Sequence, residues 1–210
     1  ETKKTRKVLH GIDHETFRPI PTIKRKGNQI ITTASADVPL KGLIYLIRAY
    51  AILLKEFPDL KLLVIGRLRE GPTDQELKKE GIKEKVKFIS DLTGRQIAEL
   101  YAESTIAISP SVYEGFGFPA GEAMSCGIPL ISTNGGSLPE VVGDAGIIVP
   151  HSNPKALKDA IKSLLDSPEK RIEFGNKGRE RVLEKFAWNR AAKELVEVYR
   201  EAIDNADNRP

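Results

Sequence analysis

The chain has 210 residues, of which 40% are hydrophobic and 30% are charged, a size and balance ordinary for one globular domain with a sizeable core. It carries 33 basic and 29 acidic residues, and a net charge of +4 is too small for the basic surface of a nucleic-acid-binding protein. We therefore expect no nucleic-acid partner. The sequence shows no apolar run of membrane-spanning length and no signal peptide.

The single cysteine, Cys126, cannot form an internal disulfide and is expected to pack as a small buried thiol. This usage fits a reducing compartment, so we predict a cytoplasmic location and leave peripheral attachment to the inner face of a membrane open. The opening residues contain no methionine, which suggests that the chain starts inside a longer protein.

The first segment, residues 1–26, is basic and irregular, with prolines at positions 19 and 21. It is expected to lead into the domain rather than to belong to its core. His10 and His14 stand four positions apart on it, but nothing nearby has ligand character. We therefore predict no metal site there.

From Gln29 onward, short β-branched runs alternate with helical patterns, which is typical of right-handed βαβ crossovers and a mostly parallel sheet. An apolar stripe at helical spacing from Leu43 to Phe57 is expected to face the core. The predicted strands cover residues 29–34, 61–65, 86–89, 105–109, 129–132 and 146–149.

Several helix starts carry capping signals, either a capping box or a cap residue before proline. After the last strand the pattern is helical to about Ile203, and the final helix is amphipathic. We predict an α/β, Rossmann-like fold: a mostly parallel six-stranded sheet with helices on both faces and a helical C-terminal tail. The capping signals are Thr73 with Glu76, Thr93 with Gln96, Ser137 with Glu140, Asn153-Pro154 and Ser167-Pro168.

The most informative stretch is residues 113–127, YEGFGFPAGEAMSCG, which holds two glutamates eight positions apart. Pro119 suits the first position of a helix, so Glu114 is predicted in the preceding loop and Glu122 in the first turn or two of the helix. The glycines let the backbone approach a ligand closely, and the free N–H groups of a helix start bind anions. Together these features predict a site for a polyhydroxylated, phosphorylated ligand.

An open parallel sheet binds ligands at the carboxyl ends of its strands, where the strand order reverses. Lys41 follows the first strand and lies near the start of the next helix, where an ammonium group and free N–H groups can share a phosphate. A lysine at such a place is also often only solvated. Position alone leaves both interpretations open.

The stretch 113–127 and its continuation to Val142 resemble the signature of the family 4 retaining glycosyltransferases. That signature has a glutamate, seven further residues and a second glutamate, with Gly-Phe-Gly after the first. The likeness extends from about Val8 to Tyr199. It implies the donor-binding half of an enzyme with the two-domain GT-B fold, which transfers a sugar from a nucleotide-diphosphate sugar to an acceptor hydroxyl.

The resemblance implies a role for each predicted group. Glu114 would be the catalytic residue, positioning the donor sugar and stabilising positive charge, while Glu122 would accept hydrogen bonds from the ribose hydroxyls. Lys41 would contact the diphosphate. Taken singly, Glu114 is otherwise a solvated loop acid and Glu122 an acid favoured by the helix dipole.

Backbone N–H groups of the loop between the glutamates would meet phosphate oxygens and sugar hydroxyls. These groups belong to Gly115, Phe116, Gly117 and Phe118. We expect the two phenylalanine side chains to be packing wedges rather than sugar-stacking surfaces.

Two further loops follow from the resemblance. The loop of residues 88–92, with Ile89, would hold the nucleotide base, largely through backbone groups. The family usually has an arginine five residues before the lysine, but this chain has Ala36 there, which would cost about 1.5–3 kcal/mol of donor binding. Arg67, after the second strand, is either a substitute for that arginine or a solvated loop residue. A further departure is His10, where the family usually has asparagine.

The resemblance also implies how the chain is divided. Residues 1–26 would be an interdomain hinge, residues 27–186 the nucleotide-sugar-binding domain, and residues 187–210 a helix that crosses back to an absent N-terminal domain. The expected partners are that domain, the nucleotide sugar and a saccharide or lipid-linked acceptor. No cofactor is implied, since the nucleotide sugar is a substrate. No metal is implied either, because the chain has no Asp-x-Asp motif.

Two other functions fit some of these residues. One is a catalytically silent module that binds a nucleotide sugar. The other is a glycoside hydrolase that uses Glu114 and Glu122, which would need carboxyl groups about 5–9.5 Å apart around one glycosidic bond. We expect the chain by itself to bind a nucleotide sugar without transferring it.

Overall fold

A computed structural model describes residues 5–34 and 38–207 and contains one six-stranded parallel sheet in the order β3-β2-β1-β4-β5-β6. The predicted fold class is confirmed. Each predicted strand is present, with its ends shifted by at most one residue. The strands are β1 (Gln29–Thr33), β2 (Lys61–Ile65), β3 (Val86–Ile89), β4 (Ile106–Ser109), β5 (Leu130–Thr133) and β6 (Ile147–Val149).

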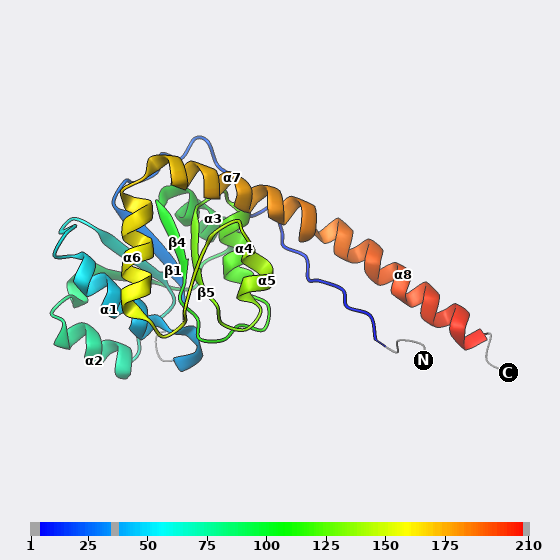
Figure 1. Cartoon of the computed structure of the whole chain (residues 1–210), viewed down its shortest axis with the longest axis horizontal. Coiled ribbons are helices and arrows are strands. Elements are labelled where there is room, and N and C mark those ends of the chain that lie inside the picture. Colours follow the sequence, from blue (N-terminus) through cyan, green and yellow to red (C-terminus); the bar gives the residue numbers. More distant parts are fainter. Residues whose placement is uncertain (1–4, 35–37, 208–210) are drawn as a thin grey trace.

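Helices cover both faces of the sheet (Figure 1). Because side chains alternate along a strand, neighbours such as Ile30 and Ile31 enter the two separate cores on either side. Helices α1, α2 and α6 contribute to one core and α3, α4, α5 and α7 to the other. Their bounds are α1 (Leu43–Leu53), α2 (Pro72–Lys79), α3 (Gly94–Glu103), α4 (Phe118–Ser125), α5 (Leu138–Val142), α6 (Pro154–Leu165) and α7 (Pro168–Lys185), with two short 3-10 helices, η1 (Pro39–Lys41) and η2 (Lys83–Lys85).

The strand order places a possible ligand site. Strands β1 and β4 pair in parallel at the centre of the sheet, and the chain continues outward from them in opposite directions. This is the point where the strand order reverses, and open α/β sheets bind ligands outside the carboxyl ends of their strands at such a point. The loops after β1 and β4 are therefore neighbours in space.

Most predicted helix caps are present, and two are wrong. Thr93 forms a full capping box with Gln96, while Asn153 and Ser167 accept hydrogen bonds from backbone N–H groups at 3.0 and 3.3 Å. Thr73 is not a cap, because α2 starts one residue earlier, at Pro72, whose fixed φ suits the first turn. Ser137 precedes α5 but makes no side-chain cap bond, since its hydroxyl is used elsewhere.

The N-terminal segment and the start of the last helix meet beside α4. The N–H of Ile12 donates to the carbonyl of Phe186 at 2.6 Å, and Ile12 forms a β-bridge with Ala187. The last helix, α8 (Trp188–Asp207), then projects from the body with the N-terminal segment alongside (Figure 1). In its predicted apolar stripe, Leu195 is 41% and Tyr199 60% exposed.

No helix within residues 5–34 and 38–207 is long and apolar enough to cross a bilayer.

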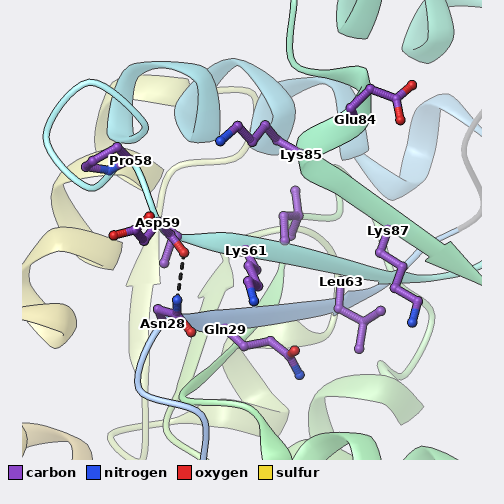
Figure 2. A pocket seen from close by; sticks show the side chains of 11 residues that line it. Asn28, Gln29, Pro58, Asp59, Lys61, Leu63, Glu84, Lys85 and Lys87 are labelled. Atoms are coloured by element: carbon purple, nitrogen blue, oxygen red, sulfur yellow. Dashed lines mark hydrogen bonds between the residues drawn. The ribbon is translucent and has the colours of Figure 1, made fainter.

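A hollow of about 430 Å³ lies at the opposite, amino ends of β1 and β2 (Figure 2). Three exposed lysines, Lys61, Lys85 and Lys87, line it around the side chain of Leu63. Lysines are common on edge strands such as β3, where they prevent pairing with another sheet. This hollow is far along the strands from the loops that carry the predicted site.

Candidate functional site

The loops after β1 and β4 bring two predicted site residues together. The Nζ of Lys41 lies 2.7 Å from Oε1 of Glu114, and the same oxygen accepts a hydrogen bond from Oγ of Ser111 at 2.8 Å. The Glu114 side chain is only 12% exposed and that of Lys41 31%. The structure therefore forms a shielded ion pair at the point where the strand order reverses.

Close backbone contact holds these two loops in place. The carbonyl of Leu40 accepts hydrogen bonds from the N–H groups of Val112, at 2.8 Å, and Tyr113, at 3.3 Å. Between Lys41 and α1, Gly42 has φ +63°, and a Cβ atom there would lie 2.1 Å from the carbonyl oxygen of Pro110. Only glycine allows this approach, which sets the reach of Lys41.

The loop after β5 supports the Gly-Phe-Gly loop, residues 114–117, from its other side. The N–H and Oγ of Ser137 both donate to the carbonyl of Glu114, at 3.0 and 3.1 Å, and its Oγ also donates to the carbonyl of Phe116 at 2.8 Å. A Cβ on Gly136 would lie 2.3 Å from the Glu114 carbonyl oxygen. The hydroxyl predicted as a helix cap thus anchors the predicted site.

The Gly-Phe-Gly loop leads directly into α4, whose N-cap is Gly117 at φ +98°. Pro119 is in the first turn, and Glu114 and Glu122 lie in the loop and the second turn, as predicted. Within the part of the chain that the structure describes, the N–H groups of Gly115, Phe116 and Gly117 donate no backbone hydrogen bond. Free N–H groups at the start of a helix are donors of the kind that can bind an anion.

Glu122 is partly buried on α4, and no described side chain forms an ion pair with it. Burial, with a smaller contribution from the negative charge of Asp13, raises the pKa of Glu122 to about 7. Asp13 belongs to the N-terminal segment, whose Ile12 packs against Gly121 of the same helix. The arrangement leaves Glu122 as a carboxyl group whose acceptor oxygens are available.

We expect Glu122→Gln to change how stability depends on pH. The folded-state pKa of Glu122, about 7, lies above its ordinary value of 4.5, so the unfolded chain releases this proton first. Stability should fall as pH rises from about 4.5 to about 7 and then level off, because the folded state resists the charge. Urea unfolding at about pH 5 and about pH 8 should show this fall in the wild type and a smaller one in the variant. An identical pH dependence in both proteins would contradict the assignment.

Arg67 and Ile89 lie together at the ends of β2 and β3. The carbonyl of Ile89 accepts a hydrogen bond from the N–H of Gly66 at 2.7 Å. The guanidinium of Arg67 donates to Oγ of Ser90 at 3.1 Å and forms an exposed ion pair with Asp91. Arg67 is thus engaged in the loop of Ile89, and the position of Ala36 lies outside the described residues.

An aromatic cluster borders the Gly-Phe-Gly loop. The ring of His10 contacts those of Phe116 and Phe118, with centroid distances of 5.1 and 5.5 Å, and Phe116 also meets Phe186 at 5.8 Å. Phe116 therefore packs as a wedge, whereas Phe118 is 42% exposed.

Cys126 is buried, and burial raises the pKa of its thiol to about 12.

Sequence reasoning missed three residues of this site. Ser111 carries no local signal in the sequence and Ser137 only that of a helix cap, and it is the fold that places their hydroxyls on the Gly-Phe-Gly loop. Asp13 lies more than a hundred positions before Glu122, and no local pattern links them.

Within the described residues, no group of three or more His, Cys, Asp or Glu side chains could hold a metal ion.

Comparison with known protein families gives a clear match. The family described as "Glycosyl transferases group 1" matches residues 13–181. The MMP alpha-(1->4)-mannosyltransferase of Mycolicibacterium hassiacum is 40% identical, covering 92% of this chain and 47% of that protein. The D-inositol 3-phosphate glycosyltransferase of Corynebacterium glutamicum is 33% identical, covering 80% and 42%. The chain spans about half the length of the curated relatives it matches.

Solved structures show the same fold. Sucrose-phosphate synthase from Thermosynechococcus elongatus superposes with a TM-score of 0.83 and 25% identity, over 96% of this chain and 53% of that one. Anabaena Alr3699/HepE, solved with UDP and glucose, gives a TM-score of 0.82 over 95% of this chain and 58% of its own. At 19% identity, the second likeness shows the fold alone.

Proposed function

The chain belongs to the group 1 glycosyltransferase family, and on this basis we propose that it is the donor-binding half of a retaining glycosyltransferase. The complete enzyme would move a sugar from a nucleotide-diphosphate sugar to an acceptor hydroxyl. The observation that carries the proposal is the Lys41–Glu114 pair, at 2.7 Å, beside free loop amides at the reversal point of the sheet. HepE, which shares the fold, was solved with UDP and glucose.

The ion pair suggests how the donor enters. A diphosphate carries more negative charge than one carboxylate, so it would compete with Glu114 for the ammonium group of Lys41. The N–H groups of Gly115, Phe116, Gly117 and Phe118 would bind the remaining phosphate oxygens. Held in this way, the diphosphate would be stabilised as a leaving group by fixed donors that need no rearrangement.

Release from Lys41 would leave Glu114 for the sugar. Its carboxylate would accept hydrogen bonds from the sugar hydroxyls and stabilise the positive charge of an oxocarbenium-like transition state. Ser111 would keep one oxygen of Glu114 oriented, since its hydroxyl already donates to that carboxylate at 2.8 Å. We propose a positioning and electrostatic role for Glu114 rather than that of a nucleophile.

Glu122 would bind the ribose. An ionised carboxylate is purely an acceptor and suits two neighbouring hydroxyl groups. Glu122 has no ion-pair partner among the described residues, and its pKa is raised to about 7. Both properties fit a carboxyl group that accepts hydrogen bonds from a ligand. Donor binding should then strengthen as pH rises through about 7, because the carboxylate forms.

The remaining assignments rest on the sequence. The loop at Ile89 would hold the base, with Arg67 at its edge. The negative charge of the diphosphate would be stabilised without a metal or a cofactor. An N-terminal domain would supply the acceptor side, for a saccharide or a lipid-linked acceptor. We propose a cytoplasmic enzyme, with attachment to the inner face of the membrane left open, whose isolated donor half binds without transfer.

A glycoside hydrolase is a poorer fit. It would need Glu114 and Glu122 to face one saccharide groove as acid and nucleophile. Glu114 is instead neutralised by Lys41 and oriented by Ser111, and the chain belongs to a glycosyltransferase family. No contact among the described residues holds the carboxyl groups of Glu114 and Glu122 facing each other.

A ligand screen tests the proposed function. The melting temperature of the chain should be measured with UDP-glucose, GDP-mannose and ADP-glucose, and then with the same nucleosides without phosphates. At a concentration of about 100 Kd, a true donor should add about 2.7 kcal/mol of stability, whereas a nucleoside should add much less. No shift with any nucleotide sugar at millimolar concentration would contradict the proposal.

A further inference from the structure

An exposed histidine of the N-terminal segment touches the Gly-Phe-Gly loop. The ring of His10 meets Phe116 with centroids 5.1 Å apart and the planes at 69°, an edge-to-face contact. It meets Phe118 at 5.5 Å, and the two phenylalanines meet each other at 4.9 Å. The three rings form one cluster across two segments that are distant in sequence.

The backbone that carries His10 is held firmly. A Cβ atom on Gly11 would lie 2.6 Å from the indole of Trp188, at the start of α8. The side chain of the next residue, Ile12, is buried against α4, where a Cβ on Gly121 would lie 2.6 Å from it. The segment 10–12 is therefore wedged between α8 and α4, and its position fixes the ring of His10.

These contacts place the segment expected to be the interdomain hinge directly against the donor loop. Phe116 and Phe118 hold two of the four backbone N–H groups proposed to bind the donor. Their rings contact His10 from one side, while Ser137 holds the carbonyl of Phe116 from the other, at 2.8 Å. Asparagine, which the resemblance places at position 10, has no ring to fill this role.

We infer that His10 is a positioning residue of the donor site, which couples the hinge to the Gly-Phe-Gly loop through aromatic contacts. The inference rests on the proposed function for its role in donor binding, but the coupling itself needs no ligand. A movement of the hinge relative to α4 shifts the ring of His10 and with it the rings of Phe116 and Phe118. The donor amides thus respond to the hinge.

The first experiment measures the coupling without ligand. Amide hydrogen exchange of Ala120 and Gly121, whose N–H groups donate to the carbonyl of Gly117 at the end of the loop, should be about three- to tenfold faster in His10→Ala than in wild type, a factor of the order expected when aromatic contacts are lost. His10→Asn should resemble His10→Ala, and His10→Phe, which keeps a ring, should restore slow exchange. His14→Ala is the matched control, because His14 is on the same segment without contact to the loop. Equal exchange in His10→Ala and wild type would overturn the inference.

The second experiment measures donor binding. Trp188 is the single tryptophan and lies against Gly11, so its fluorescence reports on the hinge. UDP-glucose, or GDP-mannose if it gives the larger thermal shift, should change Trp188 emission in wild type and in His10→Phe. In His10→Ala the emission change should be lost and binding weakened about three- to tenfold. Binding to the wild type without any change in Trp188 emission would also overturn the inference. Failure of every nucleotide sugar to bind would instead overturn the proposed function. In that case the exchange experiment alone would decide the role of His10.

Discussion

Replacing Lys41 with methionine is expected to weaken binding of the nucleotide-diphosphate sugar by about 10- to 150-fold, which corresponds to about 1.5–3 kcal/mol for a hydrogen bond to a charged group. Methionine keeps the length of the side chain but removes the ammonium that lies 2.7 Å from Glu114. The carboxylate of Glu114 would then be left with Ser111 alone and would repel the incoming diphosphate. Isothermal titration calorimetry with UDP-glucose or GDP-mannose measures the loss directly.

Lysines on the far side of the strands provide the control. Lys61→Met, in the hollow of Figure 2, changes the net charge by the same amount at the amino ends of the strands. It should leave donor affinity unchanged, because solution screening weakens distant charge effects. If Lys41→Met binds like wild type, or if Lys61→Met weakens binding equally, Lys41 does not contact the diphosphate. For UDP, which lacks the sugar that Glu114 would bind, adding Glu114→Gln to Lys41→Met should recover part of the lost affinity, since it removes the repelling charge.

Gly42→Ala is expected to damage both stability and binding. At φ +63° alanine is strained, and its Cβ would lie 2.1 Å from the carbonyl oxygen of Pro110, a backbone atom that cannot move alone. The loops after β1 and β4 must separate, which draws Lys41 away from Glu114. We expect an unfolding free energy lowered by more than about 2 kcal/mol, the upper cost of the left-handed conformation alone. Donor affinity should fall at least as far as in Lys41→Met.

Gly81→Ala separates the strain of alanine at positive φ from the clash of its Cβ atom with Pro110. Gly81 has φ +67°, almost the same as Gly42, but no atom lies within 4 Å of the Cβ that alanine would add. It should lose only about 1–2 kcal/mol of stability and retain full donor binding. Chemical denaturation of both variants gives the comparison. Equal losses for Gly42→Ala and Gly81→Ala would show that the close approach to Pro110 is unimportant.

Much of the fold could be predicted because its determinants are local. Short β-branched runs and cap residues such as Thr93 mark the strands and helices within a few positions, and the alternating order then requires a parallel sheet. The same reasoning placed Lys41 and Glu114 in loops at one edge. Thr73 failed because a proline just before it begins the helix earlier, so two competing local signals gave the wrong start.

The rest of the site depends on contacts between distant segments. Ser137 carries a capping signal, yet its hydroxyl donates to carbonyls of the Gly-Phe-Gly loop because β5 lies beside β4. The raised pKa of Glu122 reflects its burial and the approach of Asp13, which only the folded N-terminal segment provides. The aromatic contact of His10 is of the same kind. Such features follow from the fold, and a local pattern does not contain them.

A crystal structure of the chain with its best-binding nucleotide sugar tests the central claim most directly. We expect the diphosphate between Nζ of Lys41 and the N–H groups of residues 115–118, with the ribose hydroxyls on Glu122 and the Lys41–Glu114 pair opened. A nucleotide bound elsewhere, with Lys41 still on Glu114 and nothing on Glu122, would contradict it.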